Sequence, residues 1–366
     1  MKTHNYNFVR RVNFIVRTDA NKEIGYGHFF RTLVLAEKLT TLGATVQYLF
    51  YANPQIATIL KKKKIKFHQF HANKNIKKLN TNEISWFLKK NKCFKKNCLI
   101  VDHPLADENY LKNAKNICDY LVVYVVDHLK ERYYYGDILI NQNYKASKNL
   151  IKSEKRSLKL VGTKFVLIGK NFLSLKKKYV KENSIFANFG GSDNYNLSQK
   201  LVKIFIGYIK QKQFNGIKLN LVVGPGYKYF RRIKSSTKNI KKIKIYKNPK
   251  NLNSIMSNSK IAIVAAGAIC WELAYLGILG IIVPVSRNQN RNSKQLNRDK
   301  YFYSIEKRSF LSKNVIVDKI KFLFKNYDYI MKNKERKLRT LVDGKGVDRI
   351  FDNIKKVIEK KLNFIK

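Results

Sequence analysis

Residues 12–43 read VNFIVRTDANKEIGYGHFFRTLVLAEKLTTLG and contain the pattern that decides the fold. Val12–Arg17 is mainly apolar and is typical of a buried strand. A loop with two glycines follows, and Phe29–Leu42 then places apolar residues at helical spacing until Gly43, a typical helix C-cap. Thr45–Phe50 begins the next apolar strand. This stretch predicts a β-α-β unit with parallel strands.

The same alternation of apolar runs and helical segments continues along the chain. A polar stretch, SLKKKYVKEN at 174–183, is typical of an interdomain linker, so we predict two domains, 1–178 and 179–366. The predicted fold class is α/β, with two Rossmann-like domains facing a cleft and ligands bound at the carboxyl ends of the strands. The last 60 residues are predicted to be mainly helical. The further predicted strands are Cys98–Asp102, Leu121–Val126, Asp137–Ile140, Phe165–Ile168, Ile185–Phe189, Leu219–Val223, Ile261–Val264 and Ile281–Val285.

The composition is strongly basic. The chain has 75 Lys and Arg against 24 Asp and Glu, a formal net charge of +51. Nucleic-acid binding, attraction to an anionic membrane and a compositional bias could each produce this excess. The lysines are spread along the chain and uncharged Asn and Ile are abundant as well, which favours a compositional bias. A 45% hydrophobic content excludes a disordered basic tail. In every case the positive field attracts anionic small molecules at low salt.

The cysteines and one apolar stretch bear on the location of the protein. No signal peptide is visible, because the N-terminus runs straight into a predicted strand. Ile261–Ser286 is long enough to span a membrane, but Glu272 lies in its middle and Pro284 ends it, which favours strand, short helix and buried strand. We therefore expect a cytoplasmic protein with no membrane span. The cysteines form neither a CxxC pair nor a regular framework and are expected to be reduced thiols: Cys93, Cys98, Cys118 and Cys270.

The loop after the first strand contains the first candidate site. RTDA at 17–20 and GYGH at 25–28 bring glycines that let the backbone approach a ligand closely, ahead of a helix N-terminus that attracts anions. A dinucleotide-binding fingerprint would need glycine where Phe30 stands. His28 falls in the first turn of the helix, where a neutral imidazole can act as general base. A capping or packed histidine is the alternative interpretation.

Three further motifs fall in the predicted second domain. NFGGSD at 188–193 is typical of a strand, glycine turn and helix cap that binds phosphate, and also of a plain β-to-α turn. AAGAICWE at 265–272 opens a helix with small residues and places Glu272 one turn in, where it could accept hydrogen bonds from ribose or act as a helix-dipole partner. The amides of Asn288 and Gln289 follow a strand and could contact phosphate or sugar oxygens, or form an ordinary polar loop.

Metal-binding patterns are missing from the sequence. His68 and His71 have no matching carboxylate and are expected on a solvated face, and no Asp-x-Asp pair is present to hold a divalent ion on a diphosphate. The P-loop and Gly-x-Ser-x-Gly are also missing. We therefore predict no metal and no cofactor.

Several motifs in a recognisable order resemble the nucleotide-sugar hydrolases of pseudaminic acid biosynthesis and related spore-coat polysaccharide proteins. The resemblance covers about residues 12–352. It implies the two-domain, metal-independent glycosyltransferase fold (GT-B), with UDP held mainly by the C-terminal domain. It also implies release of UDP from UDP-2,4-diacetamido-2,4,6-trideoxy-β-L-altropyranose for a surface glycan. The motifs are RTDA…GYGH at 17–28, VDHLKER at 126–132 with DILINQNY at 137–144, FGGSD at 189–193, LVVGP at 221–225, CWELAYLG at 270–277 and LVDGKGVDRI at 341–350.

The resemblance also implies residue roles. His28 matches the catalytic histidine that activates the attacking water, Glu272 matches the carboxylate that holds the nucleotide, and Asn288 matches an asparagine of the substrate pocket. We predict that His28 and Asp19 are catalytic. The predicted substrate-binding residues are Arg17, Gly25, Gly27, Asp102, Gly190, Gly191, Ser192, Asp193, Gly267, Ala268, Glu272, Asn288 and Gln289.

The chain also departs from the family pattern. Asp102-His103-Pro104 stands where the hydrolases usually have Asp-His-Tyr, and this loss changes the sugar contacts. Ala268 and Ile269 replace a pair of hydroxyl residues. His128 replaces a second Asp, and Gly169-Lys170-Asn171 replaces Arg-Pro-Glu. His103 and His128 are each interpreted as a turn residue or a pocket residue.

Three functions follow as alternatives. The main prediction is a UDP-sugar hydrolase in which His28 activates water. The second is a glycosyltransferase of surface polysaccharide synthesis, in which His28 deprotonates an acceptor hydroxyl. The third is a basic nucleic-acid-binding protein. The expected partner is a UDP-sugar, without specific nucleic-acid binding.

Overall fold

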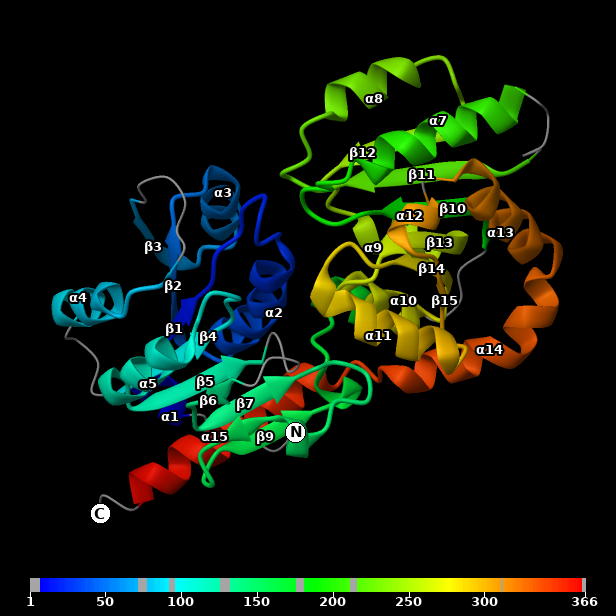
Figure 1. Cartoon of the computed structure of the whole chain (residues 1–366). Coiled ribbons are helices and arrows are strands. Elements are labelled where there is room, and N and C mark those ends of the chain that lie inside the picture. The colour runs from blue at the N-terminus through cyan, green and yellow to red at the C-terminus, as the bar shows by residue number, and fades with distance from the viewer. Residues whose placement is uncertain are drawn as a thin grey trace. The chain divides into compact units, whose positions relative to one another are not determined.

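The computed structural model describes residues 7–71, 78–91, 96–125, 132–175, 181–210, 216–310 and 312–363. The chain divides into two compact units (Figure 1). The N-terminal unit comprises Met1–Ile24, His28–Leu167 and Lys345–Lys366, and the C-terminal unit comprises Gly25–Gly27 and Ile168–Gly344.

In its described residues, the N-terminal unit has a seven-stranded parallel sheet in the order β3-β2-β1-β4-β5-β7-β9. The central strands are buried, and helices α4 and α5 pack on one face through Ile84, Phe87 and Leu111. The strands are β1 Val12–Arg17, β2 Thr45–Tyr51, β3 Lys66–Phe70, β4 Lys96–Val101, β5 Tyr120–Tyr124, β7 Ile138–Asn141 and β9 Leu158–Val161, with a separate pair β6 Tyr133–Tyr134 and β8 Lys152–Ser153. The helices are α1 Asn7–Arg11, α2 Gly27–Thr41, α3 Pro54–Lys62, α4 Asn82–Lys90, α5 Glu108–Ile117 and α15 Gly346–Asn363, with short turns at Lys148–Leu150 and Thr163–Phe165.

The described part of the C-terminal unit has a six-stranded parallel sheet in the order β12-β11-β10-β13-β14-β15. One face of this sheet forms a core with α7 and α13, for example through Leu201 and Ile320. The strands are β10 Glu182–Asn188, β11 Lys218–Val223, β12 Ile243–Lys247, β13 Ser259–Ala265, β14 Leu279–Val283 and β15 Tyr303–Ser304. The helices are α6 Lys170–Leu173, α7 Leu197–Lys210, α8 Phe230–Ser236, α9 Leu252–Ser257, α10 Ile269–Leu276, α11 Arg287–Arg298, α12 Lys307–Phe310, α13 Lys313–Lys325 and α14 Tyr327–Leu341. The predicted fold class, two parallel α/β sheets, is confirmed.

Each sheet has a point where the strand order reverses. In the N-terminal unit the chain passes from β1 to β2 and β3 on one side and then continues from β4 on the other side. In the C-terminal unit the same reversal occurs at β10 and β13. Loops that leave the carboxyl ends of such neighbouring strands diverge and leave room for a ligand. The loops after β1, β4, β10 and β13 are therefore where binding residues are expected.

The last helix differs from the predicted domain division. The sequence assigns 345–366 to the second domain, but in the structure this segment belongs to the N-terminal unit. Helix α15 is amphipathic, and its buried side chains include Ile350 and Ile354. Polar contacts at the surface also join it to this unit: Lys38 Nζ lies 2.7 Å from Asp348 Oδ1, and Arg349 donates to the carbonyl of Lys164 at 2.9 Å. The predicted boundary at 178/179 lies outside the described residues.

The apolar stretch 261–286 is divided among β13, α10, β14 and the start of the following loop, as the sequence indicated. Among the described residues, no helix has the length and apolar character needed to cross a membrane.

Candidate functional site

The imidazole of His28 is held by the carboxylate of Asp102. His28 lies in the first turn of α2, which begins at Gly27, and Asp102 directly follows β4, the neighbour of β1 at the reversal point. Nδ1 of His28 lies 2.7 Å from Oδ1 of Asp102, whose side chain is fully buried, whereas that of His28 is 13% exposed. Because a carboxylate only accepts hydrogen bonds, the imidazole Nδ1 carries the proton. In the neutral imidazole, Nε2 then keeps its lone pair and can accept a proton from a bound molecule.

Arg31 completes this group and was not predicted from the sequence. Its guanidinium donates to both oxygens of Asp102, at 2.7 and 2.6 Å, and lies over the ring of Tyr124 at 4.9 Å. Burial alone would raise the pKa of Asp102, but the charge of Arg31 and the contacts with His28 outweigh it and lower this pKa to about 2. Asp102 is thus ionised at neutral pH. The signal available in the sequence was the spacing of His28 and Arg31, three residues apart on one helix face.

Asp19 and Arg17 form a second, separate cluster. Asp19 Oδ1 lies 2.8 Å from Nη1 of Arg17, and its Oδ2 lies 2.8 Å from Nε2 of His103. Nδ1 of His103 accepts the backbone N–H of Leu105 at 3.0 Å, so Nε2 carries the proton and donates to Asp19. Burial lowers the pKa of His103, which keeps this imidazole neutral.

Asp19 therefore differs from its predicted position. The sequence analysis predicted both His28 and Asp19 as catalytic, but the structure pairs Asp19 with Arg17 and His103, and it is Asp102 that contacts His28. Burial opposes ionisation of Asp19, yet the charge of Arg17 lowers its pKa to about 2. The side chains of Arg17 and Asp102 are completely buried, so both, although predicted to bind substrate, lie below the surface of the site. Residues 126–131, which include His128, lie outside the described residues.

The loop after β10 is the first candidate site in the C-terminal unit. Gly190 has a left-handed backbone, φ +89°, which favours glycine, and its N–H donates to Oδ1 of Asn188 at 3.0 Å. Asp193 accepts from the first backbone N–H groups of α7, Leu197 and Ser198, at 2.9 and 2.8 Å. Asp193 is consequently a helix cap rather than a residue that points to a ligand.

Close packing explains the second glycine of this loop. A Cβ on Gly224 would lie 2.4 Å from the Cα of Gly191, and a Cβ on Gly191 would lie 2.5 Å from the ring of Tyr26. Tyr26 belongs to the short segment 25–27 that is grouped with the C-terminal unit, together with the predicted residues Gly25, at φ +78°, and Gly27. The Ser192 hydroxyl is buried and has no hydrogen-bond partner among the described residues.

The loop after β13 lies beside the first one at the reversal point. Gly267 and Ala268 precede α10, and the side-chain amide nitrogen of Gln289 would lie 3.5 Å from a Cβ on Gly267. Gln289 also accepts the backbone N–H of Val285 at 2.9 Å, which fixes it at the end of β14. Asn288 accepts from the hydroxyl of Ser286 at 2.5 Å. The structure therefore brings the Gln289 amide close to Gly267, in the loop that precedes α10.

Glu272 lies one turn inside α10 and is partly exposed. It has no hydrogen-bond or ion-pair partner among the described residues, and burial raises its pKa to about 8. At neutral pH the carboxyl is mainly protonated, so it can donate one hydrogen bond and accept others. Such a group suits a ligand with hydroxyls.

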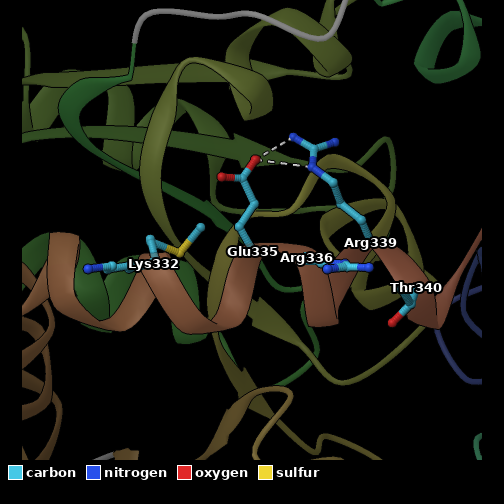
Figure 2. A pocket seen from close by; sticks show the side chains of 6 residues that line it. Lys332, Glu335, Arg336, Arg339 and Thr340 are labelled. Carbon is cyan, nitrogen blue, oxygen red and sulfur yellow. Dashed lines mark hydrogen bonds and ion pairs between the residues drawn. The ribbon is translucent and has the colours of Figure 1, made fainter.

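A surface hollow of about 560 Å³ lies elsewhere on the C-terminal unit, along α14 (Figure 2). Figure 2 shows Glu335 turned towards Arg339, with Oε1 to Nη2 at 2.8 Å. Arg339 also donates to the carbonyl of Tyr275, near the end of α10, whereas the glycine loops lie at its start. Since all six lining residues come from α14, which contacts the end of α10 rather than its start, we assign this hollow no part in the candidate site.

No group of three or more His, Cys, Asp or Glu side chains suited to a metal ion occurs in the described part of the chain. His68, predicted on a solvated face, is partly exposed, and its ring contacts the rings of Phe70 and Trp86 with centroids 4.9 Å from each.

Comparisons with known proteins identify the fold. Residues 188–347 match the model of the glycosyltransferase family 28 C-terminal domain. An uncharacterized protein of the archaeon Methanocaldococcus jannaschii is 28% identical over 278 residues, which are 73% of this chain and 54% of the relative. The chain thus spans about half the length of the curated relative it matches.

Among solved structures, MurG of Acinetobacter baumannii has a TM-score of 0.61 at 16% identity, covering 94% of this chain and 99% of MurG. A UDP-glucosyltransferase of Polygonum tinctorium has a TM-score of 0.62 at 10% identity (95% and 98% covered), and HepE of Anabaena, in complex with UDP and glucose, has 0.58 at 10% (95% and 99%). The chain therefore has the GT-B fold, as predicted.

Proposed function

We propose that this protein is a glycosyltransferase that takes its sugar from a UDP-sugar. The match of residues 188–347 to the glycosyltransferase family 28 C-terminal domain carries the proposal, because the loops after β10 and β13 fall within it. The fold shared with HepE, whose structure contains UDP and glucose, supports UDP as the nucleotide. This differs from the hydrolase that the sequence favoured.

In this proposal the C-terminal unit binds the nucleotide. The N–H groups at the start of α10, and those of the loop that follows Gly190, donate hydrogen bonds to the diphosphate oxygens, helped by the helix dipole and the positive field of the chain. These groups take the place of the hydroxyls missing at Ala268 and Ile269. The carboxyl of Glu272 hydrogen-bonds the ribose hydroxyls, and the Gln289 amide contacts a phosphate or sugar oxygen.

The N-terminal unit supplies the base. Nε2 of His28 takes the proton of an acceptor hydroxyl while its oxygen forms a bond to the anomeric carbon and the bond from that carbon to UDP breaks. The Asp102 carboxylate, 2.7 Å from Nδ1, fixes the tautomer and stabilises the imidazolium that forms. Arg31 fixes Asp102 in turn, so it acts as a positioning residue.

A UDP-sugar hydrolase is the second candidate. His28, which matches the catalytic histidine in the resemblance, has its Nε2 unoccupied by the Asp102 bond, and a water molecule can yield its proton there as an acceptor hydroxyl can. The diacetamido-trideoxy sugar of pseudaminic acid synthesis would then be the substrate.

One experiment separates these functions. UDP-glucose, UDP-N-acetylglucosamine and a UDP-diacetamido-trideoxy sugar are incubated with the protein, with and without a panel of hydroxylated saccharide acceptors, and UDP release is followed by ³¹P NMR. Transfer predicts release only with an acceptor and a new glycoside by mass spectrometry. Hydrolysis predicts release in water alone. No release from any of the three under either condition, together with no binding of UDP, contradicts both.

A further inference from the structure

A hollow on the N-terminal unit, distinct from the one along α14, lies away from His28. Its volume is about 510 Å³, within the range of ligand pockets, and it lies between the end of α4 and strands β2 and β3. Lys66, which lines it, pairs with Gln47 of β2, which pairs with Ile15 of β1. Asp102 and the His28 loop follow the far ends of β4 and β1, so this hollow is a separate site.

The wall of the hollow is aromatic. Trp86 is 41% exposed, although large aromatic residues of a globular domain are usually more buried. The rings of His68 and Trp86 have centroids 4.9 Å apart, and the ammonium of Lys90 lies 4.4 Å from the centre of the Trp86 ring. An exposed indole beside polar groups offers a flat surface for the C–H face of a pyranose ring.

The polar lining suits an anion with hydroxyl groups. The charged side chains that line the hollow in the described residues are Lys66 and Lys90, both cationic, and the amides of Gln47 and Asn91 are also present. Burial, Lys90 and His71 lower the pKa of His68, so this imidazole is neutral and can exchange hydrogen bonds with hydroxyls at pH 7. A concave wall fits a chain of sugar rings better than the flat surface of a membrane.

We propose that this hollow binds an anionic saccharide, with a sugar ring on Trp86 and its carboxylate between Lys66 and Lys90. The site is independent of nucleotide binding, and its test needs no UDP-sugar.

The two tryptophans of the chain make the test direct, because Trp271 lies in the C-terminal unit. In a Trp271→Phe variant, all tryptophan fluorescence comes from Trp86. Tetragalacturonate is the probe, and maltotetraose (neutral) and tetraglutamate (anionic, without sugar) are its controls. We expect saturable binding of tetragalacturonate with a change in Trp86 fluorescence, and binding of both controls at least about tenfold weaker, since each lacks one class of contact.

Variants assign the binding to the hollow. Lys66→Gln/Lys90→Gln is expected to weaken tetragalacturonate binding about tenfold or more, whereas Lys238→Gln/Lys241→Gln, an equal loss of charge at exposed positions of the C-terminal unit, leaves it unchanged. Circular dichroism checks that each variant is folded. The proposal is overturned by equal weakening in both double variants, by tetraglutamate binding as tightly as tetragalacturonate, or by no response of Trp86. A response of Trp86 to phosphatidylglycerol vesicles but not to tetragalacturonate also overturns it, in favour of a membrane surface.

Discussion

Asp102→Asn is the substitution that best isolates the proposed base. The amide keeps the shape of the carboxyl but has one acceptor oxygen and one donor NH₂ group, so it cannot accept from both His28 and Arg31 as the carboxylate does. The imidazole loses the partner that fixes its tautomer, and the partly buried Arg31 loses its counter-charge. In catalytic triads, replacing the carboxylate that fixes the tautomer of the histidine lowers kcat about 10⁴-fold. We expect kcat to fall about 10³- to 10⁴-fold here.

The stability cost can be worked from the pKa of Asp102. Its pKa is lowered from 3.8 to about 2 in the folded protein, which corresponds to about 2 kcal/mol of stabilisation from the ionised form. Because the folded pKa is depressed, this stabilisation is complete above pH 3.8 and is lost as the pH falls through about 2. At pH 7 the variant lacks all of it, and the unpaired Arg31 adds to the loss, giving about 3 kcal/mol in total.

The assay measures kcat and unfolding on the same samples. Urea unfolding followed by Trp86 fluorescence in the Trp271→Phe background reports the N-terminal unit, and kcat is measured at 20 °C on protein shown to be folded. Asp348→Asn, at a surface ion pair with Lys38, is the matched control and should change neither quantity appreciably. A folded Asp102→Asn protein whose kcat stays within about threefold of the parent would refute the role of Asp102 in positioning His28.

Three further predictions concern His28 and the C-terminal unit. His28→Ala should abolish turnover on UDP-sugars but leave UDP affinity within about twofold by calorimetry; equal loss of both would contradict a purely catalytic role. Gly224→Ala should weaken UDP binding strongly or destabilise the C-terminal unit by about 1–3 kcal/mol, because its Cβ would lie 2.4 Å from the Cα of Gly191. Gly207→Ala inside α7 is the control: a Cβ there would meet no neighbouring atom within 4 Å, so thermal unfolding should show a stabilisation of about 0.5–1 kcal/mol. In the parent protein, the free energy of unfolding should fall as the pH rises from 4.5 to about 8, because the raised pKa of Glu272 lets the folded state keep a proton that the unfolded state has released. In Glu272→Gln this contribution is missing, so the free energy of unfolding should stay level across the same window. A parent whose thermal midpoint rises over that window would oppose this assignment.

The sequence predicts the central strands and the loops after them, because both are local patterns, but the predicted strand Phe165–Ile168 is not a strand in the structure. The edge strands β3, β9, β12 and β15 were not predicted. The apolar run before Arg17 and the spacing up to Gly43 correspond to β1 and α2, and small residues before Glu272 correspond to the start of α10. The local pattern does not show which part of the protein an amphipathic helix packs against. Residues 346–363 are evidently a helix with one apolar face, but only the folded chain shows that this face packs on the N-terminal unit.

The same reason explains which site residues were misplaced. Asp19 and Asp102 both follow the end of a parallel strand, and sequence spacing does not show which of them reaches His28. Which aspartate contacts His28 depends on the side-chain rotamers and on the nearby cations, since Arg17 forms an ion pair with Asp19 and Arg31 forms one with Asp102. Arg31 was missed because a charged residue on a helix is usually solvated, and its position in the sequence does not show that its guanidinium lies over the Tyr124 ring.

Binding of UDP tests the central claim most directly. In a ³¹P NMR titration at pH 7 and 150 mM salt, we expect saturable one-to-one binding of UDP to the parent protein and to His28→Ala, and much weaker binding to Gly224→Ala. Competition by excess inorganic pyrophosphate should be weak, because Glu272 and the loops recognise the nucleoside as well as its charge. If the parent does not bind UDP, or if pyrophosphate displaces UDP at equal concentration, a nucleotide-sugar enzyme is the wrong account of this fold.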